Sequence, residues 1–335
     1  MIPRLIPSDA PTSLTVDFLA ELHLRGFKGD TSHSHADRTV FSTDNSVYQV
    51  APQAIVFPRS DQDVVLVAKL SNEPKFAGMS FTPRGGGTGT NGQSLTSGVS
   101  VDMSRYMNTI LEVNPEEGWA RVQAGVVKDQ LNDAVRAHGL FFAPELSPSN
   151  RATIGGMIAT DASGQGSILY GKTRDHVLEL STVLLDGTPW HSRPLNPREF
   201  DDVKRRGDRV GMIHRLLDRI RTEDADLIAD KFPKLNRCVT GYDLVHLCDH
   251  CGNFNLSSII CGAEGSLAFV TEAKIRLTRI PHCMALFNIR YGSFDAALRD
   301  AGSLMKLEAA SSETVDAKVL ALAREDSICE SPRFF

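Results

Sequence analysis

A glycine-rich run at residues 84–93, RGGGTGTNGQ, constrains this chain more strongly than any other feature of its sequence. Glycine has no Cβ atom, so successive glycines allow unusual backbone conformations and let a ligand approach the main chain closely. The backbone N–H groups of such a loop can surround an anion such as a diphosphate, and Thr88, Thr90 and Asn91 add side-chain donors. The run therefore predicts a diphosphate-binding loop. A mobile hairpin without a ligand is the alternative for such a run taken alone.

The glycine spacing matches two nucleotide-binding fingerprints, and both are excluded by their context. Gly87, Gly89 and Gly92 have the G-x-G-x-x-G spacing of the dinucleotide motif, which requires a helix directly after the loop. Residues 93–98, QSLTSG, are turn-like and lead into another strand. Gly87 and Gly92 also have P-loop spacing, but Gln93 stands where that motif needs lysine. The sequence therefore excludes a Rossmann site and a nucleotide triphosphatase.

Periodicity and turn signals predict an α+β chain of two subdomains. Helices are predicted over residues 14–27, 64–70 after a capping Ser60, and 127–137, with a polar helical insertion over 196–230. Strands are predicted over residues 54–57, 79–82, 99–103, 109–113, 119–123, 177–185 and 267–277. Beyond Pro281, a strand over 286–291 and a helix over 294–307 begin a further unit.

Composition excludes some partners and compartments. The formal net charge of −5 leaves no basic excess for a nucleic acid backbone. The N-terminus lacks the features of a signal peptide, and no apolar run is long enough to span a bilayer. The six cysteines are expected to be reduced thiols. We therefore expect a cytoplasmic protein without a transmembrane segment, and peripheral attachment to the inner face of the membrane is an open alternative.

Two more segments share the small, hydroxyl-rich character of the glycine loop. The first, PELSPSNRATIGGM at residues 144–157, continues into ATDASG at 159–164. The second, GAEGSLA at residues 262–268, runs into an apolar strand. Together with TGYDL at residues 240–244, these segments resemble the FAD-binding domain of the vanillyl-alcohol oxidase superfamily, also called the PCMH-type fold. The resemblance covers about residues 53–280 and is closest to the D-lactate, glycolate and D-2-hydroxyglutarate dehydrogenases.

Within that branch, the N-terminal stretch resembles long bacterial members that carry an iron–sulfur portion after the flavin portion. The resemblance implies an N-terminal helical extension over residues 1–47 and an FAD-binding domain over 48–280, with a subdomain boundary near residue 115. Residues 281–335 would be the incomplete start of an α/β cap domain, the FAD-linked oxidase C-terminal domain that binds the substrate. An iron–sulfur cluster needs a run such as C-x2-C-x2-C, so a cluster would lie only in sequence missing from this chain.

The resemblance also implies a set of residues that bind FAD. The diphosphate would lie on Arg84, Gly85, Gly86, Gly87, Thr88, Gly89, Thr90 and Asn91. Glu145 and Ser147 would lie near the isoalloxazine edge, and Thr153, Gly155, Gly156, Asp161, Ser163 and Gly164 along the chain and ribose. Glu264, Gly265 and Val270 would close over the adenine side. Residues 84–93 contain neither histidine nor cysteine, the residues that attach flavin covalently in this family, so FAD is expected to be held non-covalently.

The implied function is that of an FAD-dependent dehydrogenase that acts on the CH–OH group of a D-2-hydroxy acid and passes a hydride from its Cα to flavin N5. D-2-hydroxyglutarate and D-lactate are the expected substrates, and the electron acceptor is unknown. No catalytic acid–base residue is assigned, because in the family that residue comes largely from the cap domain. Two alternatives stay open: an NADPH-dependent enolpyruvyl reductase on the same fold, and a catalytically incomplete flavin-binding module.

A cluster of histidine and cysteine residues near residue 250 is a candidate metal site. His246, Cys248, His250 and Cys251 have spacings that occur in zinc sites, but a structural zinc site needs four ligands and a second spaced pair is absent. We therefore predict no metal site and interpret these residues as ordinary side chains of a variable loop.

Overall fold

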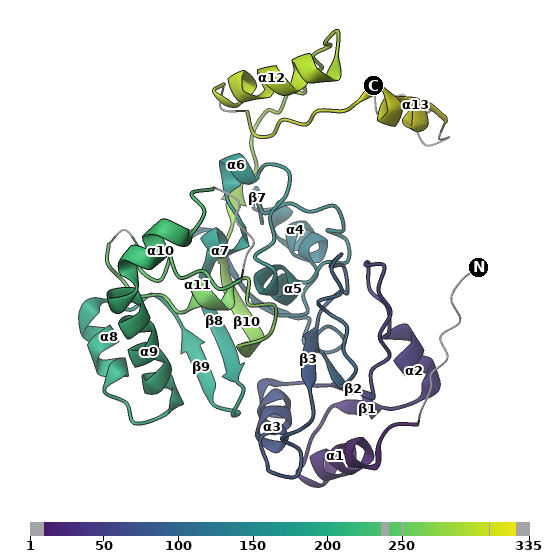
Figure 1. Ribbon diagram of the computed structural model, residues 1–335, viewed down its shortest axis with the longest axis vertical. Helices are drawn as coiled ribbons and strands as arrows, with labels where there is room; N and C mark the ends of the chain where they lie inside the picture. Colours follow the sequence, from purple (N-terminus) through teal and green to yellow (C-terminus); the bar gives the residue numbers. More distant parts are fainter. Residues whose placement is uncertain (1–9, 236–240, 250, 308, 326–335) are drawn as a thin grey trace.

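The computed structural model describes residues 10–235, 241–249, 251–307 and 309–325, and their fold is α+β (Figure 1). The helices are α1 Ser13–Leu24, α2 His35–Val40, α3 Asp61–Ser71, α4 Lys128–Arg136, α5 Ile154–Ala159, α6 Ser167–Tyr170, α7 Thr173–His176, α8 Pro197–Lys204, α9 Arg209–Glu223, α10 Ala225–Lys231, α11 Ser257–Ile260, α12 Phe294–Met305 and α13 Ala317–Glu325. The strands are β1 Asp30–Ser32, β2 Ala54–Phe57, β3 Phe81–Arg84, β4 Val99–Asp102, β5 Ile110–Asn114, β6 Trp119–Gln123, β7 Leu140–Phe141, β8 Val177–Leu184, β9 Pro189–Ser192, β10 Ala268–Arg276 and β11 Thr278–Arg279. Thr240 of the TGYDL segment, His250 of the histidine and cysteine cluster, and Cys238 and Cys329 among the expected reduced thiols lie outside the described residues.

The first unit is a four-stranded sheet in the order β1-β2-β4-β3. Strands β2, β4 and β3 are parallel, and β2 is buried along its whole length, as expected for an apolar strand covered on both faces. Helix α3 begins where predicted, because the Ser60 side chain accepts a hydrogen bond from the Asp63 amide at its first turn. Helix α1 packs onto the same core through Phe18 and Leu22, both fully buried. The predicted helix over residues 14–27 is thereby confirmed.

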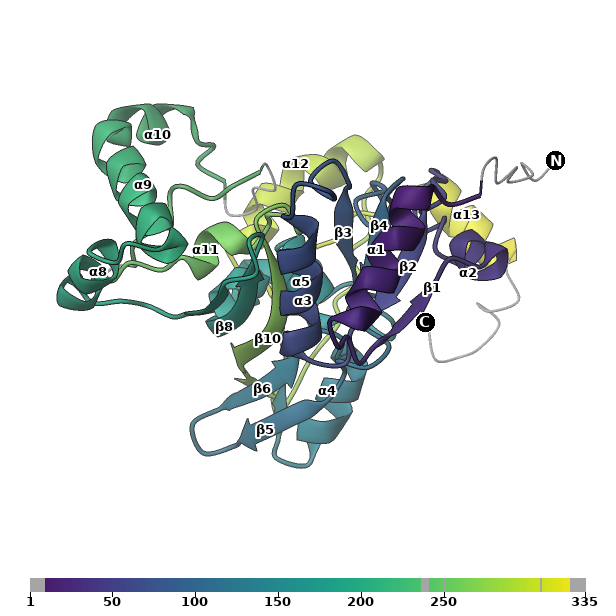
Figure 2. The same cartoon turned by 90° about the horizontal axis from the view of Figure 1, so that it is seen from below.

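The second unit is a five-stranded antiparallel sheet in the order β5-β6-β10-β8-β9. Its core joins the inner face of this sheet to helices α4 and α5 and to the insertion that carries α8 and α9. The predicted polar insertion is confirmed as α8, α9 and α10, which lie at the end of the molecule remote from α1 and α2 (Figure 2). The expected strands over residues 177–185 and 267–277 are β8 and β10.

The two units share side chains from β8 and β10. Val183 and Phe269 belong to the core of the first unit although their strands lie in the second sheet. Along the chain, the change of sheet falls between β4 and β5. The subdomain boundary near residue 115 stays a prediction; residue 115 itself lies in the turn of the β5–β6 hairpin, whose strands pair within one sheet.

Residues 281–307 and 309–325 extend away from this body and carry α12 and α13 (Figure 1). Helix α12 confirms the predicted helix over residues 294–307, but the strand predicted over residues 286–291 is wrong, since these residues form no strand. A β-strand is stable only when a neighbour satisfies its backbone groups, and no described strand pairs with this segment. Its apolar side chains, among them Leu286 and Phe287, are exposed. No helix in the described part of the chain has the length and apolar character needed to cross a membrane.

Candidate cofactor site between the two sheets

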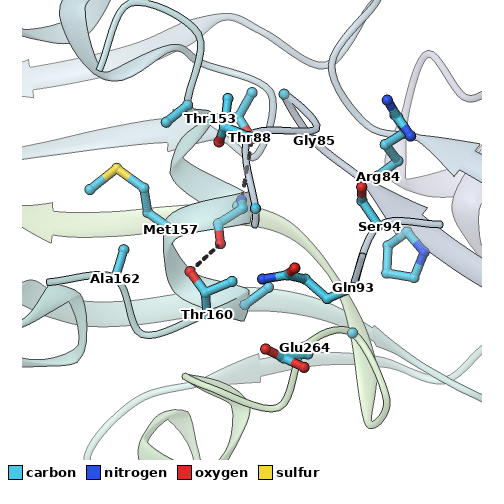
Figure 3. Close-up of a pocket in the computed structure, with 18 of the residues that line it drawn as sticks. Arg84, Gly85, Thr88, Gln93, Ser94, Thr153, Met157, Thr160, Ala162 and Glu264 are labelled. Atoms are coloured by element: carbon cyan, nitrogen blue, oxygen red, sulfur yellow. Dashed lines mark hydrogen bonds between the residues drawn. The ribbon is translucent and has the colours of Figure 1, made fainter. Parts of the chain in front are cut away.

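A cavity of about 430 Å³ lies between the two units, at the carboxyl end of β3 and beside α5 (Figure 3). Its walls come from the glycine loop, from residues 146–163 and from residues 260–270, the three segments that the sequence singles out. Ligand pockets are typically about 300–1,000 Å³. Met103, Ala124 and Met157 contribute apolar side chains, while backbone and hydroxyl groups come from the loops.

The glycine loop presents a series of unpaired backbone donors at this cavity. The amide groups of residues 85–90 donate no hydrogen bond to any atom of the described residues. Backbone donors in a folded protein are almost always paired with protein, water or a ligand. Gly87 has a positive φ of 61°, the left-handed conformation that glycine adopts without strain. Such a chain of free amides forms an anion-binding concavity.

Three glycines of the site are required by close packing, and Gly265 also has a positive φ of 76°. A Cβ atom placed on Gly86 would lie 2.0 Å from the Arg151 carbonyl oxygen, and one on Gly85 would lie 2.2 Å from Thr153 Oγ1. On Gly265, a Cβ atom would lie 2.4 Å from the Pro83 ring. At these three positions the segments around the cavity are packed so closely that no space is left for a side chain.

Helix α5 starts at the cavity with a side-chain cap. Thr153 Oγ1 accepts a hydrogen bond of 3.2 Å from the Gly156 amide, and Thr160 Oγ1 donates one of 3.1 Å to the Gly156 carbonyl (Figure 3). The Gly155 amide donates to the Ala124 carbonyl at 2.8 Å. The first turn of this short helix is therefore capped by Thr153 and tied to the Ala124 carbonyl beside the cavity.

The structure brings most of the predicted cofactor residues to this one cavity. Those that line it are Arg84, Gly85, Gly86, Gly87, Thr88, Gly89, Thr90, Thr153, Gly155, Gly156, Asp161, Ser163, Glu264, Gly265 and Val270. Asn91 lies instead on a second cavity of about 720 Å³ that adjoins the first. Glu145, Ser147 and Gly164 do not line either cavity. Their role in binding stays a prediction.

The positions of Glu145 and Ser147 follow from the alternation of side chains along this segment. Glu145 and Ser147 are exposed. The residue that follows each of them, Leu146 and Pro148 respectively, lines the cavity. Gly164 is in close contact with the same segment, since a Cβ atom there would lie 2.2 Å from the Glu145 carbonyl oxygen.

Sequence reasoning did not assign to the cofactor several residues that line the cavity, although many of them lie within the segments that it singled out. They are Pro83, Gln93, Ser94, Met103, Ala124, Leu146, Pro148, Ala152, Met157, Ala159, Thr160, Ala162, Ile260, Ala263 and Ala268. Many are apolar or small and carry no distinctive motif, although several adjoin a motif residue. Gln93 had been considered only as the residue that fails the P-loop pattern; its side chain accepts a hydrogen bond of 3.0 Å from the Asn91 amide.

Buried ion pairs support the wall between the two cavities. Asp161 and Lys172 form an ion pair with side-chain exposures of 6% and 2%. The Arg174 amide donates to Asp161 Oδ1 at 3.0 Å, and the Arg174 guanidinium pairs with Asp243. His246 Nδ1 lies 2.8 Å from Asp243 Oδ2, the oxygen that also pairs with Arg174, and burial together with the Arg174 charge lowers the pKa of the His246 imidazole. Asp161, placed by the resemblance along the cofactor, is thus also a structural carboxylate.

We expect Lys172→Ala to lower the free energy of unfolding by roughly 3–5 kcal/mol, because it leaves the Asp161 carboxylate buried without its ion-pair partner. Lys75→Ala is the matched control, since Lys75 pairs with Asp17 where their side chains are 58% and 55% exposed. That control should change the free energy by less than about 1 kcal/mol. Urea denaturation followed by circular dichroism measures both. Equal effects of the two changes would contradict a structural role for the buried pair.

The cysteines and histidines near residue 250 do not form a metal centre within the described residues. No group of three or more His, Cys, Asp or Glu side chains is placed to hold an ion there. Cys251 is exposed, and Cys261 is buried beside the second cavity, where desolvation raises the pKa of its thiol. Neither a histidine nor a cysteine of the described chain lines the first cavity.

Comparison with known proteins gives a consistent result. The family described as FAD binding domain matches residues 52–193. The chain is 58% identical over 322 residues to a D-2-hydroxyglutarate dehydrogenase of Pseudomonas putida, covering 96% of this chain and 32% of that protein. It is 52% identical over 332 residues to a D-2-hydroxyglutarate dehydrogenase of Escherichia coli, covering 99% and 33%. It is 30% identical to the glycolate oxidase subunit GlcD of Bacillus subtilis, covering 81% and 47%.

The chain therefore spans about a third of the length of the D-2-hydroxyglutarate dehydrogenases it matches. Among solved structures, an alkyldihydroxyacetonephosphate synthase superposes with a TM-score of 0.57 at 21% identity, covering 82% of this chain and 42% of that one. This likeness bears on the fold, and it agrees with the α+β arrangement of two units. Residues 52–193 of the chain thus match the family described as FAD binding domain.

Proposed function

We propose that this chain binds FAD in the cavity between its two sheets and forms the flavin-binding part of an FAD-dependent dehydrogenase of D-2-hydroxy acids. The observation that carries the proposal is the run of unpaired amides at residues 85–90, which open on a cavity lined by all three motif segments. A diphosphate supplies the acceptors that these donors lack. When bound, the flavin would supply the hydride acceptor, its N5 atom.

The lining residues fit the parts of such a cofactor. The free amides and the hydroxyls of Thr88 and Thr90 suit a diphosphate, and the apolar side chains of Met103, Met157 and Val270 suit the less polar parts of a dinucleotide. We assign the residues that line the cavity as the binding set, and we propose that Glu145, Ser147 and Gly164 act through the shape of the wall.

The substrate class rests on the relatives. D-2-hydroxyglutarate dehydrogenases match nearly the whole chain, and glycolate and D-lactate proteins match more distantly. We therefore propose D-2-hydroxyglutarate first and D-lactate second as substrates. We also propose that residues 281–335 belong to a cap domain that completes the substrate site. In this proposal the protein works in the cytoplasm, and an iron–sulfur cluster would use ligands outside residues 1–335.

Two other functions would give different results. An enolpyruvyl reductase on the same fold needs NADPH to reduce its flavin, so rapid anaerobic mixing with NADPH would bleach the flavin absorbance. A catalytically incomplete flavin-binding module would bind FAD, but its flavin would stay oxidised after mixing with D-2-hydroxyglutarate, even in a longer protein that includes a complete cap domain. In the proposed dehydrogenase, D-2-hydroxyglutarate and not NADPH reduces the flavin of that longer protein.

We expect the purified chain to bind FAD tightly and to release it on acid precipitation, because no histidine or cysteine of the described residues lines the cavity. The measurement is flavin absorbance in the supernatant and in the washed pellet. The same chain kept at neutral pH and passed through a desalting column is the control for loose binding. Yellow colour that stays in the acid pellet would show covalent attachment and contradict the prediction.

A further inference from the structure

A hairpin that precedes the matched FAD binding domain is packed against the glycine loop. Residues 41–50, here called the N-terminal hairpin, fold back on themselves through an antiparallel bridge between Thr43 and Gln49 and a 2.9 Å hydrogen bond from the Val50 amide to the Ser42 carbonyl. The family match begins at residue 52. The hairpin nevertheless contacts the glycine loop at its beginning, in its middle and at its end.

At the beginning of the loop, the hairpin binds Arg84. The Arg84 guanidinium donates to the Thr43 carbonyl at 2.6 Å and to the Phe41 carbonyl at 3.2 Å. Its carbon lies 5.1 Å from the centre of the Phe41 ring, within range of a cation–π contact. Further along, the Asn45 amide donates to the Gly87 carbonyl at 3.1 Å. This hydrogen bond holds the carbonyl oxygen of Gly87, the residue with the positive φ, toward the hairpin.

At the end of the loop, the contact is made by a carboxylate. Asp44 Oδ2 accepts a hydrogen bond of 2.9 Å from Ser94 Oγ, and Asp44 Oδ1 accepts one of 2.8 Å from the Ser46 amide. Tyr48 lies against Gly92, where a Cβ atom would be 3.0 Å from the Tyr48 ring. Partial burial acts to raise the pKa of Asp44, but the hydrogen bonds from Ser46 and Ser94 and the charge of Arg84 outweigh it and lower the pKa.

The guanidinium of Arg84 is directed to the hairpin and not to the side of the loop where the amides of residues 85–90 face the cavity. In Figure 3 it points away from Thr153 and Met157, which mark the opposite wall of the cavity. Its two hydrogen bonds to main-chain carbonyls use the fork geometry of the guanidinium, which a lysine ammonium does not reproduce. The loop amides of residues 85–90 are thereby left as the donors available to an anion.

We infer that the N-terminal hairpin is a positioning element of the cofactor site, which holds the glycine loop open so that its amides face the diphosphate, and that Arg84 acts through this hairpin rather than as a phosphate ligand. The inference rests on the proposed binding of FAD. Because Asp44 carries a negative charge and does not line the cavity, its removal separates two effects of opposite sign. A purely electrostatic effect of Asp44→Ala would strengthen the binding of an anionic cofactor, whereas loss of positioning would weaken it.

The test measures FAD affinity by flavin fluorescence, and amide hydrogen exchange in the FAD-free chain at Asn45, Asn91 and Leu95, whose amides donate hydrogen bonds within the loop or between the hairpin and the loop. We expect Asp44→Ala to weaken FAD binding by about ten- to a hundredfold, since two hydrogen bonds to a charged group are lost, and to speed exchange at these amides. Asp37→Ala is the matched control, because Asp37 accepts hydrogen bonds from Ser32 and Ser34 and contributes the same charge without contacting the loop. It should leave both measurements unchanged.

Arg84 supplies the second arm of the test. Arg84→Lys keeps the charge and loses the two-carbonyl contact, so positioning predicts that it weakens FAD binding nearly as much as Arg84→Gln. Near-normal affinity in Arg84→Lys, or unchanged or tighter binding with unchanged exchange in Asp44→Ala, would overturn the inference alone. Failure of the unchanged chain to bind FAD would overturn the proposed function, and the inference with it.

Discussion

Gly87→Val should weaken FAD binding by at least about a hundredfold. The φ of 61° at this residue is strongly disfavoured for a β-branched side chain, and a Cβ atom would lie 2.6 Å from Arg84 Nη2. The loop must therefore shift, and its amides lose the arrangement that surrounds a diphosphate. Gly89→Val should have a similar effect, because its Cβ atom would lie 2.5 Å from the Gln93 side chain. Isothermal titration with FAD measures both changes.

Gly139→Val is the matched control for backbone strain. Gly139 also has a positive φ, 68°, but a Cβ atom there would meet no atom within 4 Å, and the residue lies in the α4–β7 turn and does not line the cavity. It should lose some stability and keep its affinity for FAD. Wild-type affinity in Gly87→Val would contradict the assignment of the glycine loop, and an equal loss in Gly139→Val would attribute the effect to general instability.

The FAD-loaded chain of residues 1–335 should not turn over D-2-hydroxyglutarate, D-lactate or glycolate. Oxidation of a 2-hydroxy acid needs a base for the hydroxyl proton and a cation for the carboxylate. In the described cavity, Arg84 is bound to the hairpin and Asp161 is paired with Lys172, so neither is available as a clamp or a base. Positioning and base catalysis together contribute well over about 10⁴-fold in rate, and we expect a loss of at least that size.

The measurement is anaerobic stopped-flow absorbance of the oxidised flavin after mixing with each acid. Dithionite is the control, since it must bleach the same sample completely and show that the flavin can be reduced. Bleaching by a hydroxy acid at an enzymatic rate would place the catalytic groups inside residues 1–335. Arg151, Arg174 and His246 would then be the first residues to mutate, together with His250, which lies outside the described residues.

The parts of the fold that the sequence predicted are those determined by local signals. Ser60 marks the start of α3, Gly139 follows the end of α4, and the apolar run 54–57 is β2. The strand expected over residues 286–291 failed because strand formation depends on a partner elsewhere in the chain, which periodicity does not report. Likewise, only strand pairing shows that β5 and β6, on either side of the boundary predicted near residue 115, belong to one sheet.

The candidate site was predictable as a set of segments but not as a set of orientations. Glycines and small hydroxyl residues identified the three loops that meet at the cavity. The direction of a side chain depends on the backbone at that residue, which is why Leu146 and not Glu145 lines the wall. Arg84 shows the same limit: its position next to the loop suggested a phosphate ligand, whereas tertiary contacts turn it to the carbonyls of Phe41 and Thr43.

The central position of β10 in the second sheet determines when this chain can complete its fold during synthesis. Without β10, the second sheet consists of two separate hairpins, β5–β6 and β8–β9, each with an open edge that β10 later closes. The first core also remains incomplete until Phe269 joins it. At about 5–20 residues per second, the glycine loop leaves the ribosome on the order of ten seconds before β10. Flavin capture must then be a late event of biogenesis, and the nascent chain must be protected from edge-to-edge association until that strand arrives.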